Sequence, residues 1–107
     1  MGSRLGEENI DLANALNLLL GGVPVTYYGE ELGMVDLPKD KIEYEDCQDD
    51  AAKKRGPELF SLYSRDYERT PMQWSTKTNT AGFTDRSNVK TWLPVNSNYK
   101  SINAEVK

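Results

Sequence analysis

Carboxylates are the most abundant side chains in this sequence that could act as an acid, a base or a nucleophile. The chain has 107 residues, of which 17 are aspartate or glutamate, one is cysteine and none is histidine. The absence of histidine excludes Ser-His-Asp and Cys-His nucleophile systems and any metal site built on histidine ligands. Acid and base chemistry would therefore depend on carboxyl groups, although carboxylates this numerous are usually solvated surface groups.

The single cysteine lies in an acidic segment, residues 43–50. One cysteine excludes an intrachain disulfide and a zinc site made of paired cysteines. A reactive thiol needs a positive neighbourhood, which the acidic residues around Cys47 do not supply. The segment also lacks the glycine and the alternating oxygen ligands of a helix-loop-helix calcium site, so it is predicted to be an exposed, solvated loop. Neither a metal ion nor another cofactor is predicted.

The charge and hydropathy of the chain exclude several classes of partner. A net charge of −4 argues against nucleic acids and anionic membranes, which attract basic patches. The only basic run, residues 53–55, follows the acidic segment and is expected to be neutralised locally. The longest apolar stretch, residues 15–25, is interrupted by Asn17 and two glycines, so no membrane span is predicted. Residues 1–3 are expected to be an added leader.

The first element that could position functional residues is a helix over residues 7–20. Acidic Glu7 and Glu8 suit its first turn, and apolar residues recur at helical spacing and become nearly continuous toward its end. That C-terminal half is predicted to be buried. Gly21 and Gly22 end the helix, and Pro24 prevents its continuation.

A short strand is predicted next, over residues 23–28, where β-branched and aromatic residues run up to Gly29. Pro24 lies at its start, where a missing hydrogen-bond donor is tolerated. Residues 4–29 thus read as one helix and one strand of a parallel α/β sheet or barrel. One strand cannot form a sheet, so the remaining strands must come from elsewhere.

The rest of the chain predicts little regular structure. Residues 30–96 read as a loop-rich insert, with short helical turns expected near residues 49–54 and 57–63. Residues 97–107 read as the start of a helix that the C-terminus truncates. Because the mean hydropathy is only −0.70, the isolated chain is expected to be marginally stable, and its unpaired strand favours self-association.

Two motifs in this order resemble one branch of the α-amylase superfamily. Residues 21–34 (GGVPVTYYGEELGM) resemble the eighth-strand segment of the maltase and oligo-1,6-glucosidase branch of the family 13 glycoside hydrolases. Residues 64–74 (SRDYERTPMQW), followed by residues 81–83 and 91–96, resemble the long insert after that strand. The resemblance covers residues 4–107.

The resemblance implies a fragment of a (β/α)8 barrel: the seventh helix, the eighth strand, the insert and the start of the eighth helix. In this family the catalytic carboxylates follow the fourth, fifth and seventh strands, and the last of them belongs to an Asn-His-Asp motif. This sequence has no histidine and resembles none of those segments. Retaining glycosidases need two carboxyl groups roughly 5 Å apart, so no catalytic residue is predicted here.

One residue is predicted to bind substrate. By its motif position, Arg69 matches a family arginine that reaches the sugar in the innermost subsite; the alternative is an ion pair with neighbouring Asp66 or Glu68. Arg65 and Asp66 are expected to be structural.

The aromatic residues near these motifs have two interpretations. Tyr27, Tyr28 and Glu30 are expected mainly to hold the strand end and the barrel rim together, although such side chains can also touch a sugar. Trp74 and Trp92 are expected to anchor a small satellite core rather than to stack on sugars.

The resemblance implies a parent α-glucosidase that hydrolyses maltose- or sucrose-type sugars with retention, with an oligosaccharide as its partner. The alternative from another class is the heavy-chain ectodomain of a heteromeric amino-acid transporter, which is related to this branch and often lacks catalysis. The intact RTPMQW motif around Arg69 favours the enzyme. A third possibility is a fragment made as an antigen or a binding surface.

Overall fold

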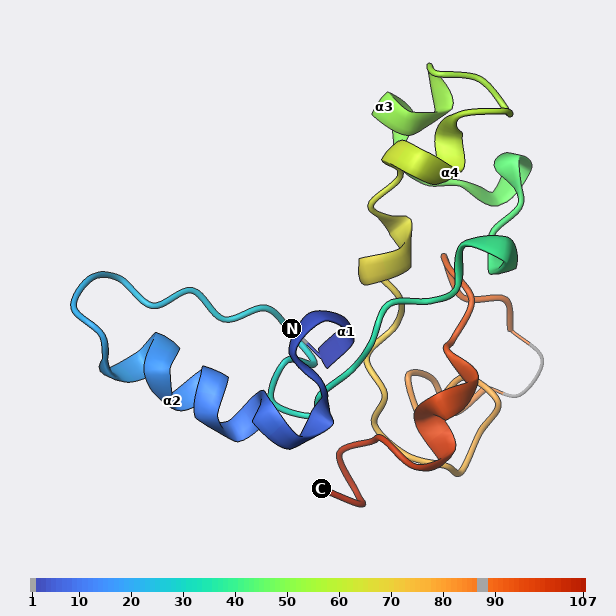
Figure 1. Cartoon of the computed structure of the whole chain (residues 1–107). Helices are drawn as coiled ribbons and strands as arrows, with labels where there is room; N and C mark the ends of the chain where they lie inside the picture. The colour runs from blue at the N-terminus through green and yellow to red at the C-terminus, as the bar shows by residue number, and fades with distance from the viewer. Residues whose placement is uncertain (1, 87–88) are drawn as a thin grey trace.

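The computed structural model describes residues 2–86 and 89–107. A helical arm, which contains the helix over residues 10–19 and the segment that returns along it, is joined to an irregular lobe, which contains the loop-rich insert and the C-terminal residues (Figure 1). The principal extents are 41 × 33 × 21 Å. Four short α-helices and five 3₁₀ turns are present in the described residues: α1 (Gly2–Leu5), η1 (Glu7–Asn9), α2 (Ile10–Leu19), η2 (Lys39–Lys41), η3 (Tyr44–Asp46), α3 (Asp50–Lys53), α4 (Phe60–Tyr63), η4 (Asp66–Glu68) and η5 (Ser97–Lys100). Within those same ranges there is no β-strand.

The predicted first helix is present, but it is shorter at its start. Residues 7–9 form the 3₁₀ turn η1, and α2 runs from Ile10 to Leu19 before Leu20 becomes extended (φ −71°, ψ 149°). The expected burial of its C-terminal half is wrong for this chain, because Ile10 alone among the α2 residues is buried and Leu19 is 83% exposed. Among the described residues, no second layer covers this apolar face. No helix in the described part of the chain is long and apolar enough to cross a membrane.

The predicted strand at residues 23–28 is not formed. After α2 the chain turns and runs back along the helix without regular structure (Figure 1). The Nδ2 atoms of Asn17 and Asn14 donate to the carbonyl oxygens of Val25 (3.0 Å) and Glu30 (3.5 Å), and these bonds tie the returning segment to α2. A strand requires a hydrogen-bonded neighbour, which this segment lacks among the described residues, so Val23 stays 90% exposed.

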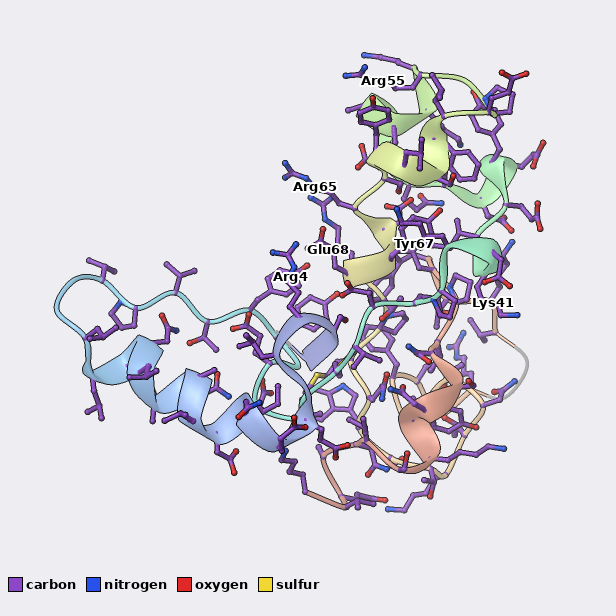
Figure 2. All side chains as sticks on the ribbon, viewed as in Figure 1. Arg4, Lys41, Arg55, Arg65, Tyr67 and Glu68 are labelled. Atoms are coloured by element: carbon purple, nitrogen blue, oxygen red, sulfur yellow. The ribbon has the colours of Figure 1, made fainter. Side chains whose placement is uncertain are left out.

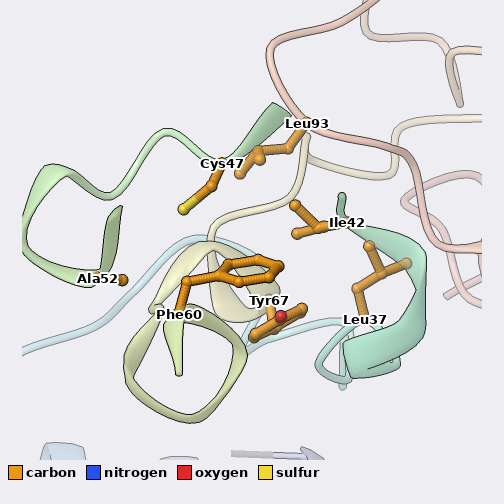
Figure 3. Packing of buried hydrophobic residues seen from close by; sticks show 7 residues of the cluster. All are labelled: Leu37, Ile42, Cys47, Ala52, Phe60, Tyr67 and Leu93. Carbon is orange, nitrogen blue, oxygen red and sulfur yellow. The ribbon is translucent and has the colours of Figure 1, made fainter. Parts of the chain in front are cut away.

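The hydrophobic core lies in the loop-rich insert instead. Seven buried residues pack together there, as Figure 3 shows: Leu37, Ile42, Cys47, Ala52, Phe60, Tyr67 and Leu93. Half-buried Tyr44 adds an edge-to-face contact with Phe60 (5.4 Å between ring centroids). The predicted solvated loop at residues 43–50 needs correction, because Cys47 lies inside this core and η3 lies within the segment.

The C-terminal residues do not open an α-helix, which corrects the prediction for residues 97–107. They form the 3₁₀ turn η5 and then irregular turns. The reason is Asn103, whose Nδ2 donates to the carbonyl of Tyr99 (2.8 Å), the acceptor that a continuing helix would use. Its Oδ1 accepts from the backbone N–H groups of Glu105 and Val106 and so closes a separate turn.

The N-terminal residues pack against the turn that follows Gly29. A Cβ atom at Gly2 would lie 2.7 Å from the carbonyl oxygen of Gly33, so glycine is the residue that fits there. Ser3 Oγ accepts a hydrogen bond from the backbone N–H of Asp36 (2.7 Å). Whether residues 1–3 are an added leader stays a prediction, but Gly2 and Ser3 contribute to the structure.

We expect the exposed leucine face of α2 to make the chain self-associate, because apolar area left in water is buried when two copies meet. Sedimentation velocity should show a mass that rises with concentration. Replacing Leu16 and Leu19 together with lysine should remove that rise. Asp11→Lys, which adds positive charge without removing apolar area, should keep it. A strict monomer at every concentration would contradict the prediction.

Candidate functional site

The end of the returning segment is joined to the RTPMQW motif by one hydrogen bond. Tyr28 Oη donates to the carbonyl oxygen of Thr70 at 2.9 Å, across 42 positions of sequence. Thr70 is buried, and partial desolvation of the Tyr28 hydroxyl, with the neighbouring Tyr27, raises the pKa of Tyr28 well above its ordinary value. Beside it, the Tyr27 ring lies 4.6 Å away between centroids, and Glu30 Oε2 accepts from the Tyr27 backbone N–H (3.1 Å). Tyr28 and Glu30 therefore stabilise the end of the returning segment.

The backbone of Arg69 is fixed on both sides. Its N–H donates to the carbonyl of Asp66 (3.0 Å), which closes η4, and its carbonyl accepts from Trp92 Nε1 (3.1 Å). The Arg69 side chain is exposed and forms no ion pair with any residue that the structure describes. The alternative ion pair with Asp66 or Glu68 is thus not formed, and the guanidinium is free to bind a ligand.

Asp66 has a structural role, as expected. Its side chain is buried, and its Oδ2 accepts hydrogen bonds from the backbone N–H groups of Gln48 (2.7 Å) and Asp49 (3.2 Å). Its own N–H donates to Ser64 Oγ (3.1 Å). The carboxylate is therefore used to join η4 to the segment before α3, and it is turned away from solvent and from any ligand.

Three hollows lie next to one another along this face. The central one, here named the Arg69 hollow, has a volume of about 420 Å³ and is lined by Tyr27, Arg65, Glu68 and Arg69. It shares Tyr27 and Glu68 with a hollow of about 410 Å³ beside Tyr28 and Thr70. In Figure 2, Arg65 and Glu68 project from the ribbon on the side that faces the helical arm, with Arg4 nearby. Arg65, which the sequence analysis expected to be structural, lines this hollow together with Arg69.

The third hollow, here named the Arg55 hollow, has a volume of about 360 Å³. It borders the Arg69 hollow through Arg65 and Arg69, and its lining residues are Asp49, Ala51, Ala52, Arg55, Tyr63, Arg65 and Arg69. The Arg55 guanidinium lies over the Tyr63 ring, 4.3 Å from its centroid. Sequence reasoning missed Arg55, Tyr63 and Glu68. Only Glu68 had a signal, since it lies within the recognised motif.

Asp49 organises the wall between α3 and η4. Its Oδ1 accepts from the backbone N–H groups of Ala51 and Ala52 and caps α3, while its Oδ2 accepts from the Arg65 N–H (3.1 Å). The Arg65 hydrogen bond is the main cause that lowers the pKa of Asp49, and the α3 amides and the Arg69 charge act in the same direction. The carboxylate is therefore committed to backbone donors.

We expect Asp49→Ala to lower the free energy of unfolding by about 1 to 2 kcal/mol near neutral pH, the usual cost of losing an N-cap. The pKa of Asp49 is lower in the folded chain than in the unfolded chain, where it is about 3.9. The stabilisation is therefore complete above about pH 5, begins to fall near the unfolded value, and is lost as the pH falls through the folded value. Urea unfolding at several pH values measures it. Asp50→Ala, with no side-chain hydrogen bond among the described residues, should cost less; equal losses would contradict the prediction.

Neither tryptophan is the buried anchor of a satellite core, which corrects that expectation. Trp74 is 50% exposed and Trp92 is 44% exposed, and neither belongs to the buried cluster of the insert. Trp92 packs edge-to-face on Phe83 (4.8 Å between centroids) and uses its indole N–H on the Arg69 carbonyl. Trp92 therefore supports the site residue directly.

Cys47 is buried in the core, and burial is the main cause that raises the pKa of its thiol. Among the described residues, no group of three or more Cys, Asp or Glu side chains is arranged to hold a metal ion.

Comparison with known proteins assigns the chain to a family. The family model for the α-amylase catalytic domain matches residues 1–107. The chain belongs to the α-amylase catalytic-domain family. It is part of such a domain, and hence a partial TIM barrel without its own strands among the described residues.

The similar members of the α-amylase family are several times longer than this chain. The salivary α-glucosidase of Aedes aegypti is 47% identical over 107 residues, which are 100% of this chain and 17% of that protein. The α-glucosidase of Apis mellifera is 46% identical over 101 residues, 94% of this chain and 17% of that protein. A crystal structure of the trehalulose synthase MutB superposes with a TM-score of 0.74 at 31% identity, covering 97% of this chain and 22% of the other.

The transporter alternative also has relatives, but they are less similar. The amino acid transporter heavy chain of Homo sapiens is 36% identical over 105 residues, 98% of this chain and 13% of that protein. Because the α-glucosidases match at higher identity over the same region, the α-glucosidase interpretation is favoured and the transporter heavy chain is not.

Proposed function

We propose that this chain is part of a retaining α-glucosidase that hydrolyses maltose- or sucrose-type sugars. Within that parent, α2 serves as the seventh helix of the barrel, residues 23–28 as the eighth strand, and residues 30–96 as the insert that follows it. The chain spans about a sixth of the length of its α-glucosidase relatives, as a part of such a catalytic domain would. Residues 23–28, which have no regular structure here, would pair as a strand once neighbouring strands are supplied.

The observation that carries the proposal is the hydrogen bond from Tyr28 to the Thr70 carbonyl. It ties the end of the proposed strand to the RTPMQW motif and brings Tyr27 and Arg69 to the same hollow. In a (β/α)8 barrel the residues after each strand face the active site. A guanidinium that forms no ion pair with the described residues can donate directed hydrogen bonds from that place to the hydroxyl groups of a neutral sugar.

In this proposal Arg69 binds and orients the sugar in the innermost subsite. Trp92 holds its carbonyl, and Tyr28 and Glu30 hold the facing rim. The nucleophile and the acid/base carboxyl groups come from the rest of the parent, because retaining hydrolysis needs two carboxyl groups roughly 5 Å apart across the scissile bond. The substrate partner is accordingly a carbohydrate that binds the assembled barrel.

The test is a kinetic measurement on the full-length parent. Hydrolysis of maltose and of a nitrophenyl α-glucoside should occur with retention, which proton NMR of the first product anomer detects. A pure, folded parent that binds α-glucosides without cleaving them would refute the enzyme assignment. It would then leave the fold assignment intact, because strand pairing of residues 23–28 can be examined independently in a structure of the parent.

A further inference from the structure

The arginines around the Arg55 hollow are an unexpected grouping in an acidic chain. The net charge of the protein is −4, yet Arg55, Arg65 and Arg69 line one hollow of about 360 Å³. All three side chains are exposed, and none forms an ion pair with a residue that the structure describes. Like charges gathered in this way repel one another unless an anion lies between them.

Asp49, the one carboxylate among the described lining residues, offsets only part of this positive charge. Asp49 Oδ1 accepts from two backbone amides of α3, and Asp49 Oδ2 accepts from the backbone of Arg65. Its oxygens are therefore directed to main-chain donors rather than to the guanidinium groups. Three guanidinium groups and one carboxylate thus line the hollow, which leaves it with an excess of positive charge.

One of the three arginines is also held in place before any ligand binds. The Arg55 guanidinium stacks on the Tyr63 ring at 4.3 Å, which reduces the rotamer freedom that it would lose on binding. The backbone N–H of Arg65 is anchored to Asp49 and that of Arg69 to Asp66. The volume of the hollow falls within the range of small-molecule sites.

We propose that Arg55, Arg65 and Arg69 form a binding site for an oxyanion, a phosphate or carboxylate group. Planar guanidinium groups bind such oxygens with paired, charge-assisted hydrogen bonds. The oxyanion has two possible sources: a free or sugar-borne anion, or a carboxylate from the remaining chain of the longer parent. The site adjoins the Arg69 hollow but does not depend on the proposed glucosidase activity, because the oxyanion is bound and not transformed.

The test is a titration of the 107-residue chain, labelled with nitrogen-15, with inorganic phosphate near neutral pH. Chloride keeps the ionic strength constant, and the Nε–Hε resonances of the arginines report binding. We expect saturable shifts with a dissociation constant in the millimolar range. Arg55→Gln and Arg65→Gln should each weaken binding about tenfold. Lys54→Gln removes the same charge from an exposed neighbour outside the lining and should leave the affinity nearly unchanged.

Two further comparisons control for structural damage and distinguish the two possible sources of the anion. Arg65→Gln leaves the Arg55–Tyr63 stack intact, so its effect cannot come from losing that contact. Phosphate that binds the chain and the full-length parent alike identifies a free anion as the ligand. Phosphate that binds the chain but is excluded from the parent identifies a carboxylate of the parent's own chain. Shifts that stay linear, or an equal loss in Lys54→Gln, would overturn the proposal.

Discussion

The 107-residue chain alone is expected to release no nitrophenol from a nitrophenyl α-glucoside above the buffer rate. A transition state with oxocarbenium character needs a carboxylate on one face of the sugar and a proton donor on the other. Around the Arg69 hollow, Glu68 is the only carboxylate among the lining residues. Asp66 is buried, and Asp49 is committed to backbone amides. The lining of the Arg69 hollow therefore offers no pair of carboxyl groups for this chemistry.

The measurement compares purified chain with full-length parent at equal molar concentration over long incubation. The parent serves as the positive control for substrate and buffer. Activity that scales with chain concentration, and that co-purifies with the chain through a second column, would show that the chain itself holds a catalytic pair. Activity that separates from the chain on that column would be a contaminating enzyme.

In the full-length parent, Arg69→Ala is expected to lower kcat/KM by roughly ten- to a hundredfold, corresponding to about 1.5–3 kcal/mol for a charged hydrogen bond. The backbone of Arg69 is fixed by Asp66 and by Trp92, so the truncation removes the guanidinium without moving the chain. Because this guanidinium would bind the distorted sugar ring more strongly than the relaxed one, its loss should lower kcat as well as raise KM.

Arg65→Ala is the matched comparison, because Arg65 lines the same hollow from the other end of η4. We expect it to reduce kcat/KM less than Arg69→Ala does. Arg69→Lys keeps the charge but loses the planar fork, so it should recover only part of the loss. Equal kinetic constants for the two alanine variants would mean that Arg69 has no privileged contact with the sugar.

Local signals in the sequence predicted helical elements in both the arm and the lobe, where the short turns expected near residues 49–54 and 57–63 are present as α3 and α4. Periodic apolar residues and the Gly21-Gly22 pair located α2 and its end to within a few residues. The strand at residues 23–28 could not form here, since pairing depends on chain that this sequence does not contain. The burial of α2 failed for the same reason. Both errors concern missing packing partners, a neighbouring strand and a layer over α2, and composition does not show whether such partners are present.

The core of the insert could not be predicted, because its members follow no period. Leu37, Cys47 and Leu93 are brought together by long-range packing and not by a repeating pattern. The truncated helix failed on a single residue, since the side chain of Asn103 competes for helical hydrogen bonds. Arg69 was found through a motif. Arg55 belongs to no motif, and only the three-dimensional placement of α3 beside η4 puts it in the same hollow.

The separation between regular structure and buried core has a consequence for spectroscopy. The longest helix, α2, has 10 residues and lies outside the cluster of the insert, whose own helices have four residues each. Far-ultraviolet circular dichroism will therefore mostly follow the arm, which little else holds in place. The packing of Tyr44 against Phe60 will be seen instead in the near-ultraviolet signal. The two wavelength regions will trace different events, and a helical signal that melts early will not mean that the lobe has unfolded.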